Sequence, residues 1–199
     1  MQDNKPDTAL EISARPLLAG MLIIQAFLGY EWFMSGLAKA LSGDFASGLA
    51  GQLTDTSKDL SGFYKSFLDG TVIPNAQFFG YLVMVGELAI GIALIALAAL
   101  WWFRWSRLSI TGQSVLLGLI VLAGVFAIFM NVNFHLASGA NHFWIIAADP
   151  NGEGVDLDSV MPVIQLAISG AAFVLLRRVR AARPADSTKG SVAASAAHS

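Results

Sequence analysis

The sequence predicts an all-α membrane protein, a four-transmembrane-helix bundle with amphipathic helices outside the bundle. The chain has 199 residues, of which 55% are hydrophobic and only 13% are charged, whereas soluble domains carry about 25% charged residues. The apolar residues are concentrated in four runs, each near or above the ~20 residues that a helix needs to cross the hydrocarbon core. Backbone polar groups in lipid must be satisfied within their own segment, so each run is expected to be helical.

The four runs divide the chain into three regions. The first run is too long for the apolar core of a signal peptide and is followed by no small-residue cleavage site, so we expect a membrane span there. The membrane domain is expected to cover residues 16–178, after a polar segment 1–15 and before an Ala/Ser-rich tail 179–199 that is expected to be disordered. The predicted spans are residues 16–41, 76–102, 108–132 and 160–176.

The distribution of Lys and Arg predicts the orientation of the chain. The two long connections hold two of these residues, Lys58 and Lys65, whereas nine lie in the terminal segments and the short second connection. The positive-inside rule therefore places both termini in the cytoplasm, and we expect a multi-pass protein of the inner (plasma) membrane. The formal net charge is −2, so the bilayer is the expected partner and nucleic acid is not.

The first long connection, residues 42–75, is predicted to contain amphipathic helices. Phe45, Leu49 and Leu53 recur at a spacing of four, as expected for one face of a helix. Asp69, Gly70 and Pro74 predict a turn into the second span. The helices are expected to lie in the headgroup region, to cover the outer mouth of the bundle, or to dock a partner. A second apolar face is expected from Leu60, Phe63, Tyr64, Phe67 and Leu68.

Glu31, Lys39 and Glu87 are ionisable residues inside or at the end of the predicted spans. Such residues are costly in lipid and usually face the interior of a bundle. At about 1.5 Å per residue, Glu31 lies roughly 13 Å and Glu87 about 16 Å from the outer ends of their spans. The two carboxyls are therefore expected at nearly one level, close to the midplane of the bilayer.

Helical spacing indicates which faces of the first two spans meet their neighbours. Ser35 shares the face of the first carboxyl and Gly91 shares the face of the second, and small residues let helices approach closely in lipid. Both carboxyls are thus expected to point toward neighbouring helices. Gly29 and Gly36 fall on a different stripe of the first span and are expected to seat another neighbour.

Two roles are open for the carboxyls of Glu31 and Glu87. As a coupled pair in a low dielectric, they would exchange a proton with a bound quinone. Alternatively, each is hydrogen-bonded to Ser35, Gln113 or a backbone carbonyl and only fixes the register of its helix. Lys39 is expected either to extend toward the membrane surface or to bind an anion at the outer mouth.

His135, His142 and Trp144 lie near the outer end of the third span and are candidates, with Lys39, for contact with a quinone or a lipid headgroup. No metal site is predicted, because the acidic segment 149–159 is followed by Val160 where a calcium loop needs a Glu. The chain has no cysteine, so no covalently attached haem and no Fe–S cluster is expected.

Two short motifs resemble a known family. Residues 29–39 read GYEWFMSGLAK, and residues 87–91 read ELAIG, with Arg104 at the end of that span. This is similar to the DoxX-like family, in which an aromatic–small–Gly–x–x–Lys sequence ends the first helix and Glu-Leu-x-x-Gly lies in the second. The long outer connections resemble the DoxD type, the small membrane subunit of thiosulfate:quinone oxidoreductase.

The resemblance covers about residues 16–178 and implies a four-helix membrane fold linked to quinone-coupled redox chemistry. Lys39 and Glu87 match the family pattern, whereas Glu31, His135 and His142 are not carried over from it. Without cysteine the chain forms no persulfide of its own, so oxidation of a sulfur compound would need a partner or direct electron transfer.

Three functions are compatible with these observations. The first is a membrane subunit of a quinone-linked oxidoreductase, coupled to oxidation of sulfur compounds. The second is a non-catalytic accessory subunit that packs against a larger respiratory or photosynthetic complex, and partner subunits are expected in both cases. The third is a transporter of protons or small solutes, although the sequence has no inverted repeat or broken helix of the kind that transporters use.

Overall fold

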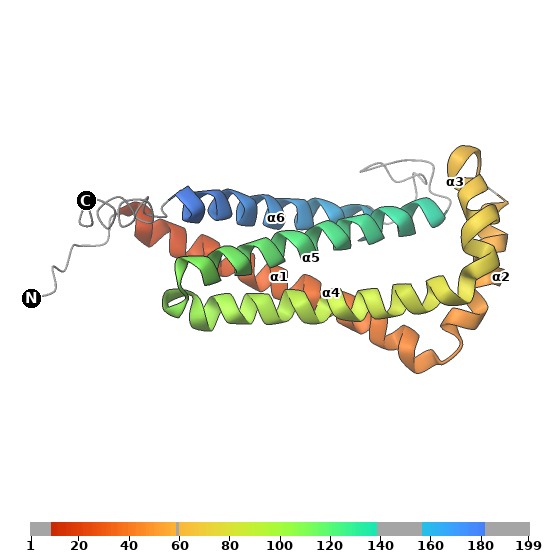
Figure 1. The fold of residues 1–199 in the computed structure, drawn as a ribbon, viewed down its shortest axis with the longest axis horizontal. Coiled ribbons are helices and arrows are strands. Elements are labelled where there is room, and N and C mark those ends of the chain that lie inside the picture. Colours follow the sequence, from red (N-terminus) through yellow and green to blue (C-terminus); the bar gives the residue numbers. More distant parts are fainter. Residues whose placement is uncertain (1–8, 59, 139–156, 182–199) are drawn as a thin grey trace, which may run out of the picture.

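The computed structural model describes residues 9–58, 60–138 and 157–181, and over these residues the chain is helical with no strand. Four of the helices are long and apolar enough to cross a membrane. They lie side by side as a bundle (Figure 1), which confirms the predicted all-α membrane fold. These helices are α1 (Ala9–Ser42), α4 (Ala76–Arg104), α5 (Ile110–Ala137) and α6 (Leu157–Ala181).

The helices extend beyond the predicted spans at most of their ends. Helix α1 already begins at Ala9, within the segment that was expected to precede the membrane domain. Helix α6 continues to Ala181, so the first residues of the predicted disordered tail are helical. The reason is that a helix can continue into water after it leaves the hydrocarbon, so apolar run length predicts the span and not the helix. The rest of the N-terminal segment and of the tail lies outside the described residues.

Two short helices, α2 (Phe45–Ser57) and α3 (Gly62–Phe67), lie across one end of the bundle (Figure 1), which we call the capped end. This agrees with the second of the three predicted placements, in which the amphipathic helices cover the bundle. The buried face of α2, the turn after α3 and the start of α4 form a small apolar cluster, against which Tyr64 and Phe67 of α3 pack. One prediction is wrong here, because the Phe63 side chain is 85% exposed instead of joining the buried face. The cluster contains Leu49, Leu53, Leu68, Val72 and Ala76.

The predicted turn before the second span is also helical. A π-helical turn, Leu68–Val72, and a 3-10 turn, Ile73–Asn75, connect α3 to α4. Pro74 occupies the first turn of the 3-10 segment, where a missing backbone N–H removes no helical hydrogen bond. Gly70 has no positive φ, so the backbone stays helical through this connection.

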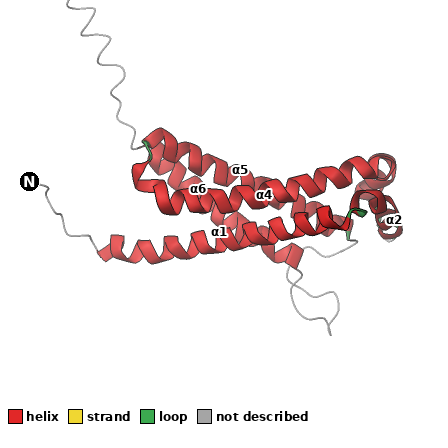
Figure 2. Ribbon diagram, turned by 90° about the horizontal axis from the view of Figure 1, so that it is seen from below, coloured by secondary structure: helices red, strands yellow, loops and turns green. Residues whose placement is uncertain are grey.

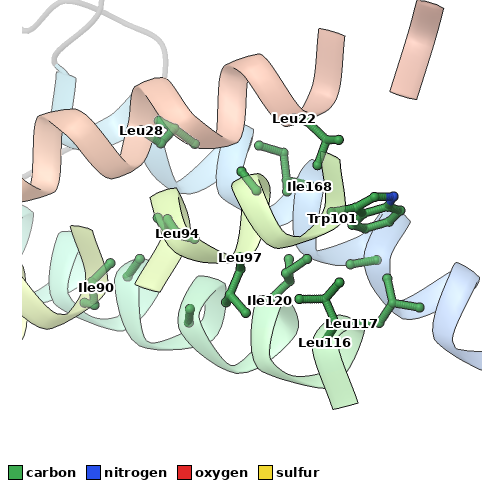
Figure 3. Packing of buried hydrophobic residues seen from close by; sticks show 14 of the residues in the cluster. Leu22, Leu28, Ile90, Leu94, Leu97, Trp101, Leu116, Leu117, Ile120 and Ile168 are labelled. Carbon is green, nitrogen blue, oxygen red and sulfur yellow. The ribbon is translucent and has the colours of Figure 1, made fainter. Parts of the chain in front are cut away.

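The bundle consists of two closely packed pairs of helices, α1 with α4 and α5 with α6, whereas α1 and α6 contact each other only sparsely. Figure 2 shows α1 running along one side of the other three long helices. Their shared core is apolar, and its residues from all four helices are labelled in Figure 3. Many large apolar side chains on the outside are exposed, as expected for helices that contact lipid. The core includes Leu22, Leu94, Leu97, Leu117, Ile120 and Ile168.

The end of the bundle opposite the cap is rich in arginine, and we call it the arginine end. It contains the last turns of α4 and α6, with Arg104, Arg178 and Arg180, and the connection with Arg107. Lys58 and Lys65 lie at the capped end. The protein is therefore a multi-pass membrane protein with an uneven charge distribution, and its orientation in a particular membrane remains a prediction.

Candidate functional site

A buried ion pair joins α1 to α4 near the capped end. The Nζ atom of Lys39, in the last turn of α1, lies 2.8 Å from each carboxylate oxygen of Glu87 on α4. Nζ also donates a hydrogen bond of 2.7 Å to the Oγ atom of Ser35, one turn earlier on α1. An ammonium group has three N–H donors, and these three oxygen atoms satisfy all of them.

The ion pair is largely shielded from the surroundings. The side chain of Glu87 is 1% exposed and that of Lys39 is 24% exposed, so the carboxylate is sealed while the ammonium retains a partial opening. The ring centroids of Phe45 and Phe134 lie 5.4 Å and 5.9 Å from Nζ, within the range of a cation–π contact. Residues from α1, α2, α4 and α5 thus surround one cation.

Glycines bring α1 and α4 close enough to place this pair. A Cβ atom on Gly36 would lie 3.0 Å from the Cβ of Glu87, and one on Gly91 would lie 2.5 Å from the backbone nitrogen of Phe33. A Cβ atom on Gly29 would lie 3.0 Å from the carbonyl oxygen of Gly91. The stripe of Gly29 and Gly36 therefore seats α4, where a different neighbour was expected.

The expected meeting of Glu31 with Glu87 is wrong. Gly36 lies level with Glu87, and five residues separate Gly36 from Glu31, which is about 7.5 Å along the helix. At about 100° per residue, Glu31 points roughly 140° away from Gly36, the contact with α4. Glu31 is half-buried, and no hydrogen bond or ion pair joins it to another described residue. Its stripe adjoins Phe27 and Met34, which are 61% and 41% exposed.

The remaining predicted site residues have different outcomes. His135 is 5% exposed, and it lies in the last turn of α5, at the same end as the ion pair. His142 and Trp144 lie outside the described residues. Gln113, an expected partner for a carboxyl, instead donates hydrogen bonds to the carbonyl oxygens of Trp105 and Leu108 near the arginine end.

Sequence reasoning missed several buried polar groups. The indole of Trp32 is 3% exposed, and its Nε1 atom has no hydrogen-bond partner among the described residues. Its ring centroid lies 6.2 Å from that of Phe134, the ring that also contacts Lys39. Gln25 donates a hydrogen bond of 3.0 Å to the carbonyl oxygen of Leu94. Gln25 could have been noticed in the sequence, because its side-chain amide lies inside an apolar run. Nothing in the sequence indicated that the indole N–H of Trp32 is buried without a described partner.

These contacts define what the site can do chemically. An isolated charge in a low dielectric is costly, so Lys39 and Glu87 each make the burial of the other tolerable. A ligand that binds Lys39 must replace one of its three oxygen partners. Trp32 offers a donor that needs no such exchange. In the part of the chain that the structure describes, no group of three or more His, Cys, Asp and Glu residues forms a metal site.

The fold and the buried ion pair define the chain as a multi-pass α-helical membrane protein with a charged site between its first two spans. No protein family, curated protein or solved structure was found to match it. Its function therefore has to be inferred from its own residues.

Proposed function

We propose that the chain is the membrane subunit of a quinone-linked oxidoreductase of the DoxX/DoxD-like kind, in the inner (plasma) membrane with both termini in the cytoplasm. One observation carries the proposal. Lys39 and Glu87, the two residues that match the pattern of that family, lie 48 residues apart in sequence and form one buried ion pair. A charged pair inside a membrane domain is a functional-site hypothesis because its burial is costly.

Lys39 and Trp32 are the residues that would hold a quinone. The fit rests on the indole nitrogen of Trp32, which is buried, has no partner in the described part of the chain and can donate to a carbonyl oxygen. A bound quinone supplies a two-electron, two-proton acceptor. The Oε atoms of Glu87 would hold a proton away from water, and the rings of Phe45 and Phe134 would exclude solvent from the ammonium. His135, at the same end, remains a further candidate.

The electron donor is proposed to act outside this chain. The sequence has no cysteine, so a sulfur compound would be oxidised on a partner subunit or by direct electron transfer. The membrane subunit would then contribute the quinone site and the carboxyl group that passes a proton to the reduced quinone. The complete oxidoreductase would therefore need at least one partner subunit.

The test uses the full chain purified in mild detergent from quinone-containing membranes. We expect stoichiometric quinone in the wild type and at least tenfold less in Lys39→Met. Glu87→Gln should retain quinone but lower quinol-linked turnover in the native assembly. Lys58→Met is the matched control, since this lysine is 68% exposed and paired with Asp55 at the capped end. A wild-type protein without quinone would contradict the proposal.

A non-catalytic accessory subunit is the second candidate, and Glu31 favours it. A carboxyl near the middle of a span costs about 2.5–3.5 kcal/mol on insertion scales. Glu31 is half-buried beside the exposed side chains of Phe27 and Met34. A helix of a partner subunit that carries a hydrogen-bond donor at this level would relieve the cost.

Photocrosslinking distinguishes the two candidates. A benzophenone amino acid in place of Met34 should capture a partner subunit in native membranes if the accessory function holds, whereas the same substitution at Val125, an exposed residue of α5, should not. Glu31→Gln should then weaken co-purification of the complex. A tightly co-purifying complex without quinone would select the accessory function over the quinone-linked one.

A further inference from the structure

The side chain of Phe63 on α3 is 85% exposed, more than any other large apolar side chain that the structure describes. Its ring stacks on that of Phe67, with centroids 6.5 Å apart and planes 11° from parallel. Phe67 in turn packs against the apolar cluster of the cap. The neighbouring ring thus supports Phe63 from one side, and its other side faces the surroundings at the capped end.

Aromatic side chains mark the two membrane boundaries along α4. Tyr81 and Trp102 are both exposed, and Trp102 follows Tyr81 by 21 residues, which is about 32 Å along the helix. This length matches the ~30 Å hydrocarbon core of a bilayer, and Tyr and Trp are enriched at its two interfaces. The hydrocarbon boundary at the capped end therefore lies near Tyr81.

Helix α2 crosses α4 at this boundary. A Cβ atom added to Gly80, the residue next to Tyr81, would lie 2.6 Å from the Cα atom of Ala46 on α2. Because α2 and α3 lie across the axis of the bundle (Figure 1), they run along the plane of a bilayer that the four long helices cross. The cap is therefore level with the lipid headgroups, which extend the bilayer to about 40–45 Å.

Helix α3 lies at the same boundary, as its contact with α5 shows. Gly86 of α4 packs against Met130 of α5, whose Sδ atom would lie 3.2 Å from an added Cβ. Because α4 and α5 are antiparallel, Asn133 lies about 4.5 Å nearer the capped end than Met130, which is two residues of α4 inside the boundary. The hydroxyl of Tyr64 donates a hydrogen bond of 3.0 Å to the carbonyl oxygen of Asn133. Phe63, which precedes Tyr64 on α3, thus lies where headgroups meet acyl chains.

We propose that α3 anchors the cap in the bilayer, with the ring of Phe63 inserted between the lipid acyl chains of the leaflet at the capped end. The lipid-facing surface reaches this level because Phe78, 65% exposed and three residues beyond Tyr81, continues the exposed apolar face of α4. Segments in the interface bury their apolar side chains about 5–10 Å into it. The lipid thereby holds α2 and α3 over the buried ion pair. The inference does not depend on the proposed quinone-linked function, since it concerns the cap and not a bound ligand.

Fluorescence of single labelled cysteines tests the depth of Phe63, because the chain has no cysteine of its own. Full-length Phe63→Cys carries a nitrobenzoxadiazole label and is reconstituted into phosphatidylcholine vesicles. We expect at least twofold stronger quenching by phosphatidylcholine with a nitroxide at acyl carbon 5 than with one on the headgroup. Asp55→Cys is the matched control, since Asp55 is 78% exposed on the face of α2 opposite Leu53, and the headgroup nitroxide should quench it more strongly.

Two substitutions of Phe63 test the ring without a label. Hydrogen exchange of the α3 amides in lipid nanodiscs should accelerate at least threefold in Phe63→Asp and stay within twofold of wild type in Phe63→Leu. An acidic residue in the first turn favours a helix, so faster exchange in Phe63→Asp would come from the lost lipid contact. Equal exchange in the two variants, or stronger headgroup quenching at position 63, would overturn the inference. Quenching at position 63 that falls as the protein-to-lipid ratio rises would overturn it in favour of a second copy of the chain.

Discussion

The Nζ atom of Lys39 lies within 2.8 Å of both carboxylate oxygens of Glu87, so the last turn of α1 is fixed to a sealed position on α4. The contact is polar, yet it lies beside a close approach of the two helices at Gly36, where an added Cβ atom would lie 2.8 Å from the backbone nitrogen of Leu88. The ion pair and the glycine contacts therefore both stabilise the interface between α1 and α4. Separate substitutions can test each of them.

Replacing Lys39 with Met should destabilise the bundle strongly. The substitution keeps the volume of the side chain but leaves the carboxylate of Glu87 buried without its ammonium. Breaking a buried ion pair from one side costs about 3–5 kcal/mol. Thermal unfolding of the purified chain in detergent, followed by circular dichroism, should show a clearly lowered midpoint.

Lys58→Met supplies the matched control for this prediction. Lys58 and Asp55 also form a close ion pair, but their side chains are 68% and 78% exposed. The hydrogen bond from Lys58 lowers the pKa of Asp55 below its ordinary value, yet exposed pairs contribute little to stability. The unfolding midpoint of this variant should be close to wild type, and an equal loss in both lysine variants would contradict the importance of burial.

Removing both charges should be tolerated better than removing one. A Lys39→Met, Glu87→Leu double variant has no lone charge to bury, and apolar replacements of buried ion pairs are often neutral or stabilising. We expect it to unfold at a higher temperature than Lys39→Met. Additive losses in a double-mutant cycle would mean that the two residues do not interact.

Gly91→Ala should separate α1 from α4. The added Cβ would lie 2.5 Å from the backbone nitrogen of Phe33 and 2.8 Å from the carbonyl oxygen of Gly29, and backbone atoms cannot move aside cheaply. Overpacking of this kind costs about 1–3 kcal/mol. Gly118→Ala is the control, because nothing lies within 4 Å of its added Cβ. Unfolding measurements should show a loss in the first variant and no loss in the second.

Labelling of single cysteines should establish the orientation. The chain has no cysteine of its own, so one introduced thiol gives an unambiguous signal. Ser66→Cys, exposed at the capped end, should react with a membrane-impermeant maleimide added outside intact cells. Ser106→Cys, exposed at the arginine end, should react only after the cells are opened. The reverse pattern would invert the predicted topology.

Tyr64→Phe should loosen the cap. The hydroxyl of Tyr64 donates a hydrogen bond of 3.0 Å to the carbonyl oxygen of Asn133 and so ties α3 to α5. Loss of one such bond costs about 1 kcal/mol. Hydrogen exchange of the amides in α2 and α3 should accelerate, while exchange in α4 stays unchanged. Unaltered exchange in the cap would show that its apolar cluster alone holds it in place.

The spans could be predicted from the sequence because bilayer thickness sets the length of an apolar run. The partner of Glu87 could not, because an apolar run gives the depth of a carboxyl only relative to the end of its own span. Gly80 of α4 contacts Ala46 of α2 instead of α1, so α4 extends past the end of α1 and the two counts start at different levels. Six residues separate Gly36, the neighbour of Glu87, from Ser42, which is only about 9 Å.

The cap separates the surface that faces the aqueous phase from the surfaces that face the bilayer. Helices α2 and α3 lie over the end of the bundle near the ion pair, so a hydrophilic protein that approaches from the aqueous phase meets the cap first. Molecules dissolved in the bilayer meet the sides of the helices instead. A water-soluble protein and a lipid-soluble molecule would thus bind to different surfaces. Binding of one would not block binding of the other.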